Sequence, residues 1–208
     1  MERELFAFET PGLICGIDEA GRGPLAGPVV AAAVVLGPNF PLSILGDSKQ
    51  LTEKQRLYAE EVIKAEALYW AVASASAQEI DRYNILGASL LAMKRSYLKI
   101  KKDVPISLAL VDGNQRPDLD CATKTIVKGD ATIPQIMAAS ILAKNQRDRY
   151  MVLCDKRWPL YQFAKHKGYP TEEHRKACLL YGLSPIHRRS FHIEIPAKQE
   201  HAEQQLLF

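Results

Sequence analysis

Apolar positions along the chain fall into two patterns, short continuous runs and longer segments with helical spacing. The short runs predict strands, which cover residues 13–18, 29–36, 68–73, 106–111 and 123–127. The longer segments predict helices over residues 53–67, 78–102, 134–150 and 172–181, of which the second is broken near Asn84. Strands that alternate with helices are typical of an α/β domain, so we expect a single domain of that class.

Length and composition are those of a globular protein with a well-buried core. The chain has 208 residues, of which 47% are hydrophobic and 25% are charged. We expect one domain over residues 1–195 and a polar, flexible tail over residues 196–208. No run approaches the ~20 apolar residues of a membrane span, and the start Met-Glu-Arg-Glu is too acidic for a secretory signal. We therefore expect a cytoplasmic protein without a membrane partner.

The cysteines and histidines do not predict a disulfide framework or a zinc site. Cys15, Cys121, Cys154 and Cys178 are widely spaced and form no Cys-x-x-Cys pair, so we expect reduced thiols. All five histidines lie after residue 165. We expect none of them to share a helical face with a cysteine or a second histidine, and we expect solvated or nucleic-acid-facing imidazoles.

Basic residues are concentrated towards the C-terminal end. The formal net charge is +3, but residues 156–192 hold eight lysines and arginines against two acids. Such asymmetry predicts a surface that contacts nucleic-acid phosphates. The aromatic residues among these charges are expected to pack a helical lobe on the sheet rather than to stack on bases. In the helix predicted over residues 134–150, Lys144, Arg147 and Arg149 are expected to form the solvated face.

Carboxylates follow three of the predicted strands. Asp18 and Glu19 end the first apolar run, Asp112 ends the run over 106–111, and Asp130 follows the β-branched stretch. If these strands are neighbours, the acids meet at one edge of the sheet, where ligands bind in open α/β folds. A single such pair is often only a solvated turn. Because successive side chains of a strand point to opposite faces, Asp18 and Glu19 share a site only if the strand turns at residue 19.

Four convergent acids predict a site for divalent cations. An unpaired carboxylate at a buried strand end is costly unless a cation compensates it, and Mg²⁺ prefers oxygen ligands. Two ions ~3.5–4 Å apart suit phosphodiester hydrolysis. The sequence does not distinguish Mg²⁺ from Mn²⁺, since both accept oxygen ligands. Next to the first acids lie Gly21, Arg22 and Gly23, where the glycines allow close approach of a ligand and the guanidinium reaches phosphate or sugar oxygens.

The segment over residues 18–32, DEAGRGPLAGPVVAA, resembles the opening block of the bacterial type 2 ribonuclease H family, ribonuclease HII. Six further blocks follow in the order of that family: DSKQL at 47–51, VDG at 111–113, KGD at 128–130, ASILAK with RD at 139–148, HKGYPT at 166–171 and HRRSF at 187–191. The resemblance covers residues 14–192.

This resemblance implies a ribonuclease H-like fold with a mixed central sheet flanked by helices and a C-terminal helical lobe. It implies a metal-dependent endonuclease, with Mg²⁺ or Mn²⁺ as cofactor, that hydrolyses the RNA strand of RNA/DNA hybrids. It also implies cleavage 5′ of single ribonucleotides in duplex DNA by two-metal-ion catalysis, which leaves a 3′-hydroxyl and a 5′-phosphate.

The same resemblance implies roles for individual residues. The catalytic metal ligands are Asp18, Glu19, Asp112 and Asp130. The turn formed by Gly21, Arg22 and Gly23 contacts the ribose 2′-hydroxyl and the adjoining phosphate, and the 2′-hydroxyl distinguishes RNA from DNA. Lys49 contacts a phosphate, and Tyr169 packs against the deoxyribose that follows the ribonucleotide.

Two of these residues have an alternative structural interpretation. Lys49 precedes Thr52-Glu53-Lys54-Gln55, a capping-box pattern that opens a helix, so it also fits a solvated lysine. Tyr169 lies between a glycine and a proline, so it also fits an aromatic residue that anchors a turn.

The last residues, Gln204–Phe208, resemble the short peptide by which bacterial proteins bind the replicative sliding clamp. Apolar anchors on a tether suit a partner's pocket, although the tail also suits docking on its own domain.

Three other protein classes are considered. A nonenzymatic hybrid-binding module does not need four acids, and a junction resolvase would be a dimer without a 2′-hydroxyl reader. Ribonuclease HIII would ordinarily carry an extra N-terminal domain, and few residues precede the first expected strand. We expect a monomer.

Overall fold

The computed structural model describes residues 12–48 and 50–192, and its centre is a mixed five-stranded sheet. The strand order is β3-β2-β1-β4-β5. Pairing is antiparallel between β1 and β2 and between β2 and β3, and parallel between β1 and β4 and between β4 and β5. The strands are β1 Leu13–Ala20, β2 Val29–Val35, β3 Tyr69–Ala75, β4 Ile106–Asp112 and β5 Ala122–Ile126.

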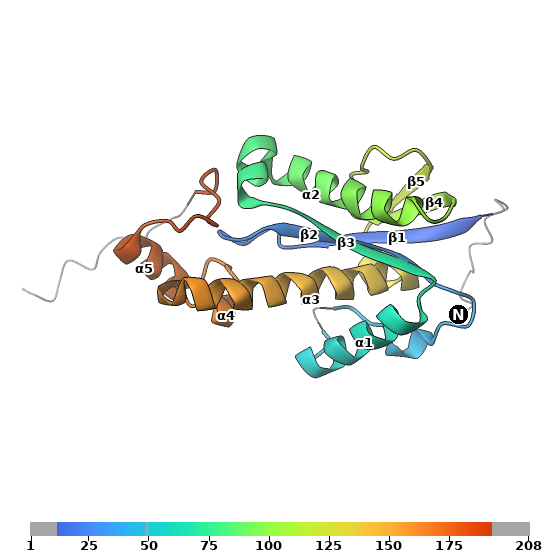
Figure 1. The fold of residues 1–208 in the computed structure, drawn as a ribbon, viewed down its shortest axis with the longest axis horizontal. Helices are drawn as coiled ribbons and strands as arrows, with labels where there is room; N and C mark the ends of the chain where they lie inside the picture. The colour runs from blue at the N-terminus through green and yellow to red at the C-terminus, as the bar shows by residue number, and fades with distance from the viewer. Residues whose placement is uncertain (1–11, 49, 193–208) are drawn as a thin grey trace, which may run out of the picture.

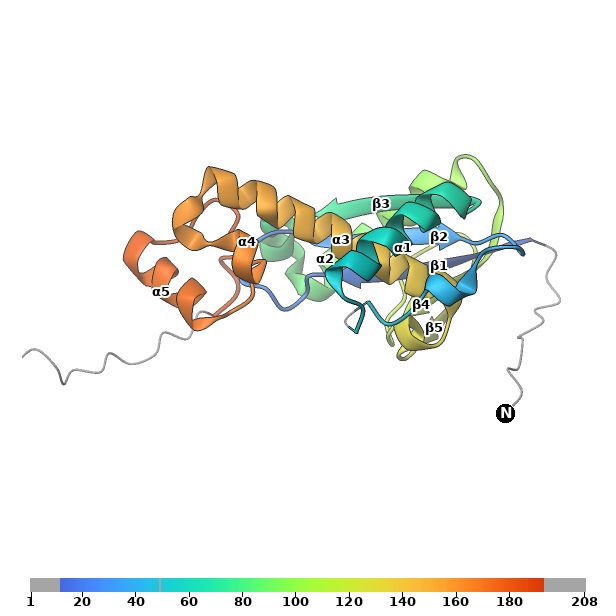
Figure 2. The ribbon, with the colours of Figure 1, turned by 90° about the horizontal axis from the view of Figure 1, so that it is seen from below.

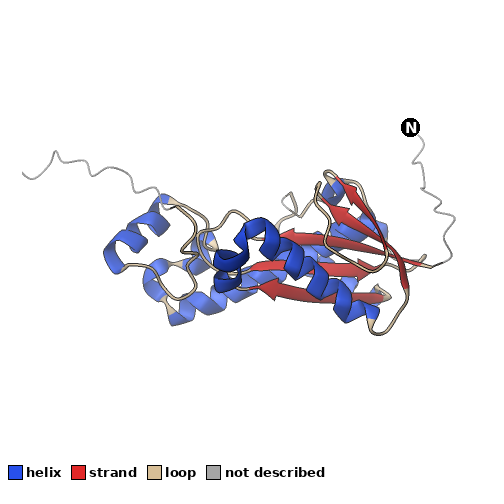
Figure 3. Cartoon of the chain, turned by 90° about the horizontal axis from the view of Figure 1, so that it is seen from above, coloured by secondary structure: helices blue, strands red, loops and turns tan. Residues whose placement is uncertain are grey.

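Helices cover both faces of this sheet (Figure 1). The helices are α1 Glu53–Glu66, α2 Ala77–Lys101, α3 Pro134–Arg157, α4 Phe163–His166 and α5 Glu172–Tyr181, with 3-10 turns η1 Leu42–Ile44, η2 Gly129–Ala131 and η3 Pro159–Tyr161. Helix α2 lies on one face, and α3 with α1 lies on the other. The end of α3, together with α4 and α5, forms a lobe beyond the end of the sheet (Figures 2 and 3).

Side chains of the central strands alternate between the two helical layers. Cys15 and Ile17 of β1 and Ala31 of β2 pack in the cluster that α2 covers. Ala32 and Val34 of β2 pack in the cluster that α3 and α1 cover. Strand β2 is buried along its whole length because both of its faces are covered and it lies between β1 and β3.

The predicted elements are present, and four of them, β1, β3, β4 and α3, are longer than predicted. Strand β1 continues two residues beyond Asp18 because Glu19 and Ala20 still pair with β2. Helix α3 continues beyond residue 150 because Met151 and Cys154 pack into the lobe. The break predicted near Asn84 is confirmed, since the backbone φ of Asn84 is +57°.

Arg147 lies in the interior, so the prediction of a solvated Arg147 is wrong. Only 1% of its surface is exposed. Its guanidinium donates hydrogen bonds to the carbonyl oxygens of Ala26 and Pro28 at 3.1 Å each. Backbone carbonyls of a distant loop therefore replace water around this charge.

Three histidines also lie in the interior, in the lobe. His166, His174 and His187 are buried, so the prediction of solvated or nucleic-acid-facing imidazoles is wrong for them. His174 also lies four residues before Cys178 on α5, so the expectation that no histidine shares a helical face with a cysteine is wrong as well. The reason is packing: these imidazoles lie against one another and against the ring of Phe163. The prediction that aromatic residues pack the lobe is confirmed for Phe163, which is fully buried.

Among the described residues, no helix combines the length and the apolar character that a membrane span needs.

Candidate active site

Parallel pairing of β1 with β4 brings Asp18 and Asp112 together. Ile17 lies opposite Val111, so Asp18 and Asp112, one residue further along each strand, are neighbours. Asp130 joins them from η2, where its backbone N–H donates a hydrogen bond to Asp112 Oδ1 at 3.3 Å. One carboxylate oxygen from each of the three aspartates lies within 4.8 Å of the others. These three residues are called the aspartate cluster below.

The turn before Asp130 has a backbone that brings it close to β4. Lys128 has a φ of +58°, in the left-handed region. A Cβ on Gly129 would lie 2.6 Å from Ile136 Cδ1 and 3.4 Å from Asp112 Oδ1. Any larger residue at position 129 would therefore require the Ile136 side chain or this turn to shift.

The electrostatics of the cluster favour a bound cation. Asp18 is buried, with 4% of its surface exposed. Its pKa is raised well above the ordinary value, first by burial and then by the nearby charges of Glu19 and Asp112. A hydrogen bond from Ser140 on α3 opposes this shift in pKa. Carboxylates this close repel one another unless a proton or a cation lies between them.

Glu19 lies beside the aspartate cluster rather than in it. Strand β1 stays paired with β2 through Ala20, so the expected turn at residue 19 is absent. The charge of Glu19 nevertheless acts on Asp18, and the charge of Asp112 acts on Glu19, so the Glu19 carboxylate is close enough to share the site. Burial raises the pKa of Glu19, and the neighbouring Arg22 opposes this shift. The Arg22 guanidinium pairs with Glu19 Oε1 at 3.3 Å. The other oxygen, Oε2, is buried and has no hydrogen-bond partner among the described residues.

These observations suit a hard divalent cation. The donors are carboxylate oxygens, which Mg²⁺ and Mn²⁺ accept. The aspartate cluster supplies three of them at close range, and the unpartnered Glu19 Oε2 is a fourth nearby. The four residues present therefore have the chemistry that the sequence resemblance requires.

The turn over residues 21–23 follows directly after β1. Gly21 has a φ of +98°, and a Cβ there would collide with the Arg147 side chain, so only glycine suits this position. The Arg22 side chain is half exposed, and its ion pair with Glu19 connects the turn to the acids. A Cβ placed on Gly23 would lie 3.9 Å from Cε1 of Tyr169.

Tyr169 thus lies next to this turn, although it comes from the lobe. The residue is 42% exposed, and the Arg147 guanidinium lies 5.8 Å from the centroid of its ring. The structure brings Tyr169 and the Gly21–Gly23 turn together. Lys49 lies outside the described residues.

Sequence reasoning missed the residues that support this site from behind. Ser140 hydrogen-bonds Asp18, and Arg188 donates hydrogen bonds to four backbone carbonyls around the turn. These carbonyls belong to Gly21, Arg22, Gly27 and Pro28. Arg188 lies in the HRRSF block, but neither its spacing nor its type indicates that it is buried against a segment more than 150 residues away.

Comparison with known proteins agrees with this geometry. The sequence profile of the Ribonuclease HII family matches residues 15–194. This chain belongs to the ribonuclease HII family. The ribonuclease HII of Nitrosomonas europaea is 54% identical to it over 181 residues, which are 86% of this chain and 82% of that protein. The ribonuclease HII of Dechloromonas aromatica is 54% identical over 180 residues, which are 86% of this chain and 91% of that protein.

Solved structures of type 2 ribonucleases H share the fold. Ribonuclease H2 from Pyrococcus horikoshii OT3 superposes with a TM-score of 0.69 at 26% identity and covers 87% of this chain and 94% of its own. The ribonuclease HII in the PCNA complex from Archaeoglobus fulgidus gives 0.70 at 23% identity, covering 88% and 96%. The predicted ribonuclease H-like α/β fold is confirmed.

Membership of the ribonuclease HII family makes the protein a metal-dependent ribonuclease H, an endonuclease that acts on RNA/DNA. The prediction of an enzyme is confirmed, and the nonenzymatic binding module and the junction resolvase are excluded.

Proposed function

We propose that this enzyme cuts the RNA strand of RNA/DNA hybrids and also cuts on the 5′ side of single ribonucleotides embedded in duplex DNA. The products are a 3′-hydroxyl and a 5′-phosphate. The observation that carries the proposal is the arrangement of the Gly21–Gly23 turn, with the acids on one side through the Glu19–Arg22 ion pair and Tyr169 on the other.

In this proposal Asp18, Glu19, Asp112 and Asp130 hold Mg²⁺ or Mn²⁺, with two ions during catalysis. Bound ions would supply a hydroxide nucleophile and stabilise the leaving oxygen. A ribonuclease HIII of the same fold, at 18% identity, was solved in complex with Mn²⁺. The contribution of the chain is to hold four carboxylates beside a surface that positions the phosphodiester.

Recognition of the substrate belongs to the turn and to Tyr169. Gly21 and Gly23 let the sugar approach the backbone, and the half-exposed Arg22 reaches the adjoining phosphate. The exposed ring of Tyr169 packs against the deoxyribose that follows the ribonucleotide. Lys49, which lies outside the described residues, is proposed to contact a phosphate.

Cleavage of a DNA duplex with one internal ribonucleotide tests the proposal. The assay uses Mg²⁺ or Mn²⁺, with EDTA and the matched all-DNA duplex as controls, and maps the cut on a sequencing gel. A metal-dependent cut immediately 5′ of the ribonucleotide is expected. Activity on long hybrids alone, or a cut at another position, would refute the single-ribonucleotide part.

The tail is proposed to bind the replicative sliding clamp through Gln204–Phe208, which lie outside the described residues. The ribonuclease HII of Archaeoglobus fulgidus, which has the same fold, was solved in a complex with PCNA. A clamp pull-down with and without the last five residues tests this, and equal recovery would refute it. We further propose that the enzyme works as a cytoplasmic monomer, with residues 1–195 as the catalytic domain and 196–208 as the tail.

A further inference from the structure

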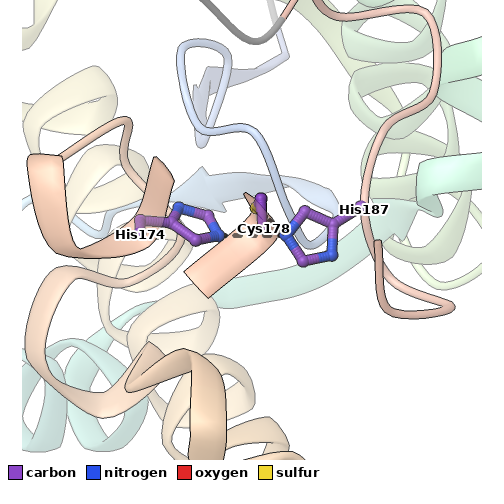
Figure 4. Close-up of side chains that lie close together, drawn as sticks. All are labelled: His174, Cys178 and His187. Carbon is purple, nitrogen blue, oxygen red and sulfur yellow. Dashed lines mark hydrogen bonds between the residues drawn. The ribbon is translucent and has the colours of Figure 1, made fainter. Parts of the chain in front are cut away.

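A cluster of metal-ligand residue types lies in the lobe, away from the acids. His174 and Cys178 come from α5, and His187 comes from the segment that follows (Figure 4). His174 Nε2 lies 3.0 Å from His187 Nε2, and Cys178 Sγ lies 3.2 Å from the same nitrogen. All three side chains are buried.

Hydrogen bonds on the far side of each ring determine where the protons lie. His174 Nδ1 is 2.9 Å from the carbonyl oxygen of Tyr169, which only accepts, so Nδ1 carries the proton and Nε2 has the lone pair. The backbone N–H of Ser184 donates to His187 Nδ1 at 2.9 Å, so the proton of His187 is on Nε2. His187 Nε2–H therefore donates to His174 Nε2.

This proton arrangement suits a hydrogen-bonded pair rather than a metal site. A cation would need the lone pair of His187 Nε2, and the proton would then move to Nδ1. There it could be accepted by Ser184 Oγ, 2.8 Å away, but it would oppose the Ser184 N–H, which now donates to Nδ1 at 2.9 Å. Burial also lowers the pKa of both histidines to about 4 and raises the pKa of the Cys178 thiol to about 11. All three groups are thus neutral near pH 7.

The hydrogen-bonded pair of His187 and His174 is connected to the backbone of Tyr169. His174 holds the carbonyl of Tyr169, and His166, which stacks on His174 with centroids 4.4 Å apart, accepts a hydrogen bond from the N–H of Gly168. The carbonyl of Gly168 in turn accepts from the N–H of Leu25 at 2.8 Å. The backbone around Tyr169 is fixed on both sides while its ring stays exposed.

His187 is also followed in the chain by Arg188, which holds the Gly21–Gly23 turn. Arg188 binds the carbonyls of Gly21 and Arg22, and its own N–H donates to the carbonyl of Leu25. One dipeptide, His187–Arg188, therefore connects the Tyr169 backbone with the Gly21–Gly23 turn.

We propose that His174, oriented by His187, is a positioning residue that places Tyr169 against the Gly21–Gly23 turn and so sets the preference for a ribonucleotide followed by DNA. This inference rests on the proposed role of Tyr169. A long hybrid offers no deoxyribose after the ribonucleotide at the cut, so the contact that His174 supports is used on the single-ribonucleotide duplex alone.

Variants at position 174 test this on both substrates. His174→Leu fills the space without a donor, and His187 can still donate to Cys178 Sγ. We expect a loss of about tenfold in kcat/KM on the single-ribonucleotide duplex and a change of less than about twofold on the long hybrid. His174→Asn, whose amide N–H lies near the place of Nδ1, is expected to restore most of the loss.

Two controls separate positioning from general stability and from metal binding. Cys178→Ala alters a neighbour of His187 that has no hydrogen bond to Tyr169, so both activities are expected to stay unchanged. Metal analysis of the purified protein after addition and removal of excess zinc is expected to find no zinc retained by the lobe. Stoichiometric zinc that disappears in Cys178→Ala would overturn the inference.

A double-mutant cycle with Tyr169→Ala decides the mechanism. If His174 acts through Tyr169, His174→Leu causes no further loss on the single-ribonucleotide duplex once the ring is absent. Additive losses, or an equal fall on both substrates in a folded His174→Leu protein, would overturn the inference.

Should the leucine variant not fold, His174→Gln, which lacks a donor at the place of Nδ1, is compared with His174→Asn. A wild-type enzyme that is inert on the single-ribonucleotide duplex would instead refute the proposed function, before any variant is measured.

Discussion

Asp18 is held at a cost to stability. Its carboxylate is buried beside Glu19 and Asp112, and burial is the largest cause of its raised pKa. A carboxyl group whose pKa is raised on folding lowers the stability of the folded state at every pH above its ordinary pKa. Such strain is common where a site is built for a ligand rather than for stability.

Asp18→Asn is therefore expected to stabilise the metal-free protein, by roughly 1–2 kcal/mol at neutral pH, while it abolishes cleavage. Urea unfolding in EDTA measures the change. Asp118→Asn is the matched control, because Asp118 is exposed and pairs with Lys94 at the surface, so little change in stability is expected. A less stable Asp18→Asn protein would show that the carboxylate has other, favourable partners.

Asp112→Asn is expected to abolish cleavage but to retain binding of the hybrid. The amide keeps the shape of the side chain and removes the charge that holds the cation. Hybrid binding by gel shift and cleavage in Mg²⁺ measure the two properties separately. Cleavage near the wild-type rate would remove Asp112 from the metal ligands.

Sequence reasoning reached the acids because each follows an apolar strand, a signal that is local along the chain. It did not reach Arg147 or His187, because their burial depends on partners more than a hundred residues away or on a loop that closes only in the folded state. The Arg147 guanidinium is bound by distant backbone carbonyls, and such partners leave no pattern in the sequence around residue 147.

At the scale of elements, local signals predicted the boundaries well wherever a side chain caps the backbone. The Thr52 hydroxyl accepts a hydrogen bond from the backbone N–H of Gln55, and the Gln55 side-chain oxygen accepts one from the backbone N–H of Thr52. These are the two hydrogen bonds of the predicted capping box. The end of α3 was missed, because its continuation depends on packing of Met151 in the lobe and not on a local signal.

The break in α2 offers a test at this scale. Asn84 has φ +57° and ψ 173°, a region that suits glycine, and its side chain accepts a hydrogen bond from the N–H of Gly87 at 3.0 Å. We expect Asn84→Ala to lower the free energy of unfolding by about 2 kcal/mol, since it loses the cap and keeps the strain. Asn84→Gly, which relieves the strain, should cost less. Equal losses in urea unfolding would contradict this account.

At the scale of the molecule, the lobe makes stability depend on pH. Burial lowers the pKa of His174 and His187 to about 4, whereas unfolded histidines titrate near pH 6.5. Between these values the unfolded state binds more protons, so the folded state loses stability as the pH falls. Solvated histidines, as predicted from sequence, would have no such effect.

We therefore expect the free energy of unfolding to fall between about pH 6.5 and pH 4, with a shallower slope in His174→Asn. Urea unfolding across this range measures both. His192→Asn is the control, because His192 is exposed and is not part of the buried histidine cluster. Identical slopes in wild type and His174→Asn would mean that this imidazole is charged when folded.

The hydrogen bonds from Arg188 to Gly21 and Arg22 join residues 167 and 166 positions apart. During synthesis, β1 and the acids of β1 and β4 leave the ribosome long before the residue that completes the neighbouring turn. A nascent chain that ends before residue 188 lacks the hydrogen bonds that hold the Gly21–Gly23 turn. We therefore expect the growing polypeptide to be a poor nuclease until its lobe has folded.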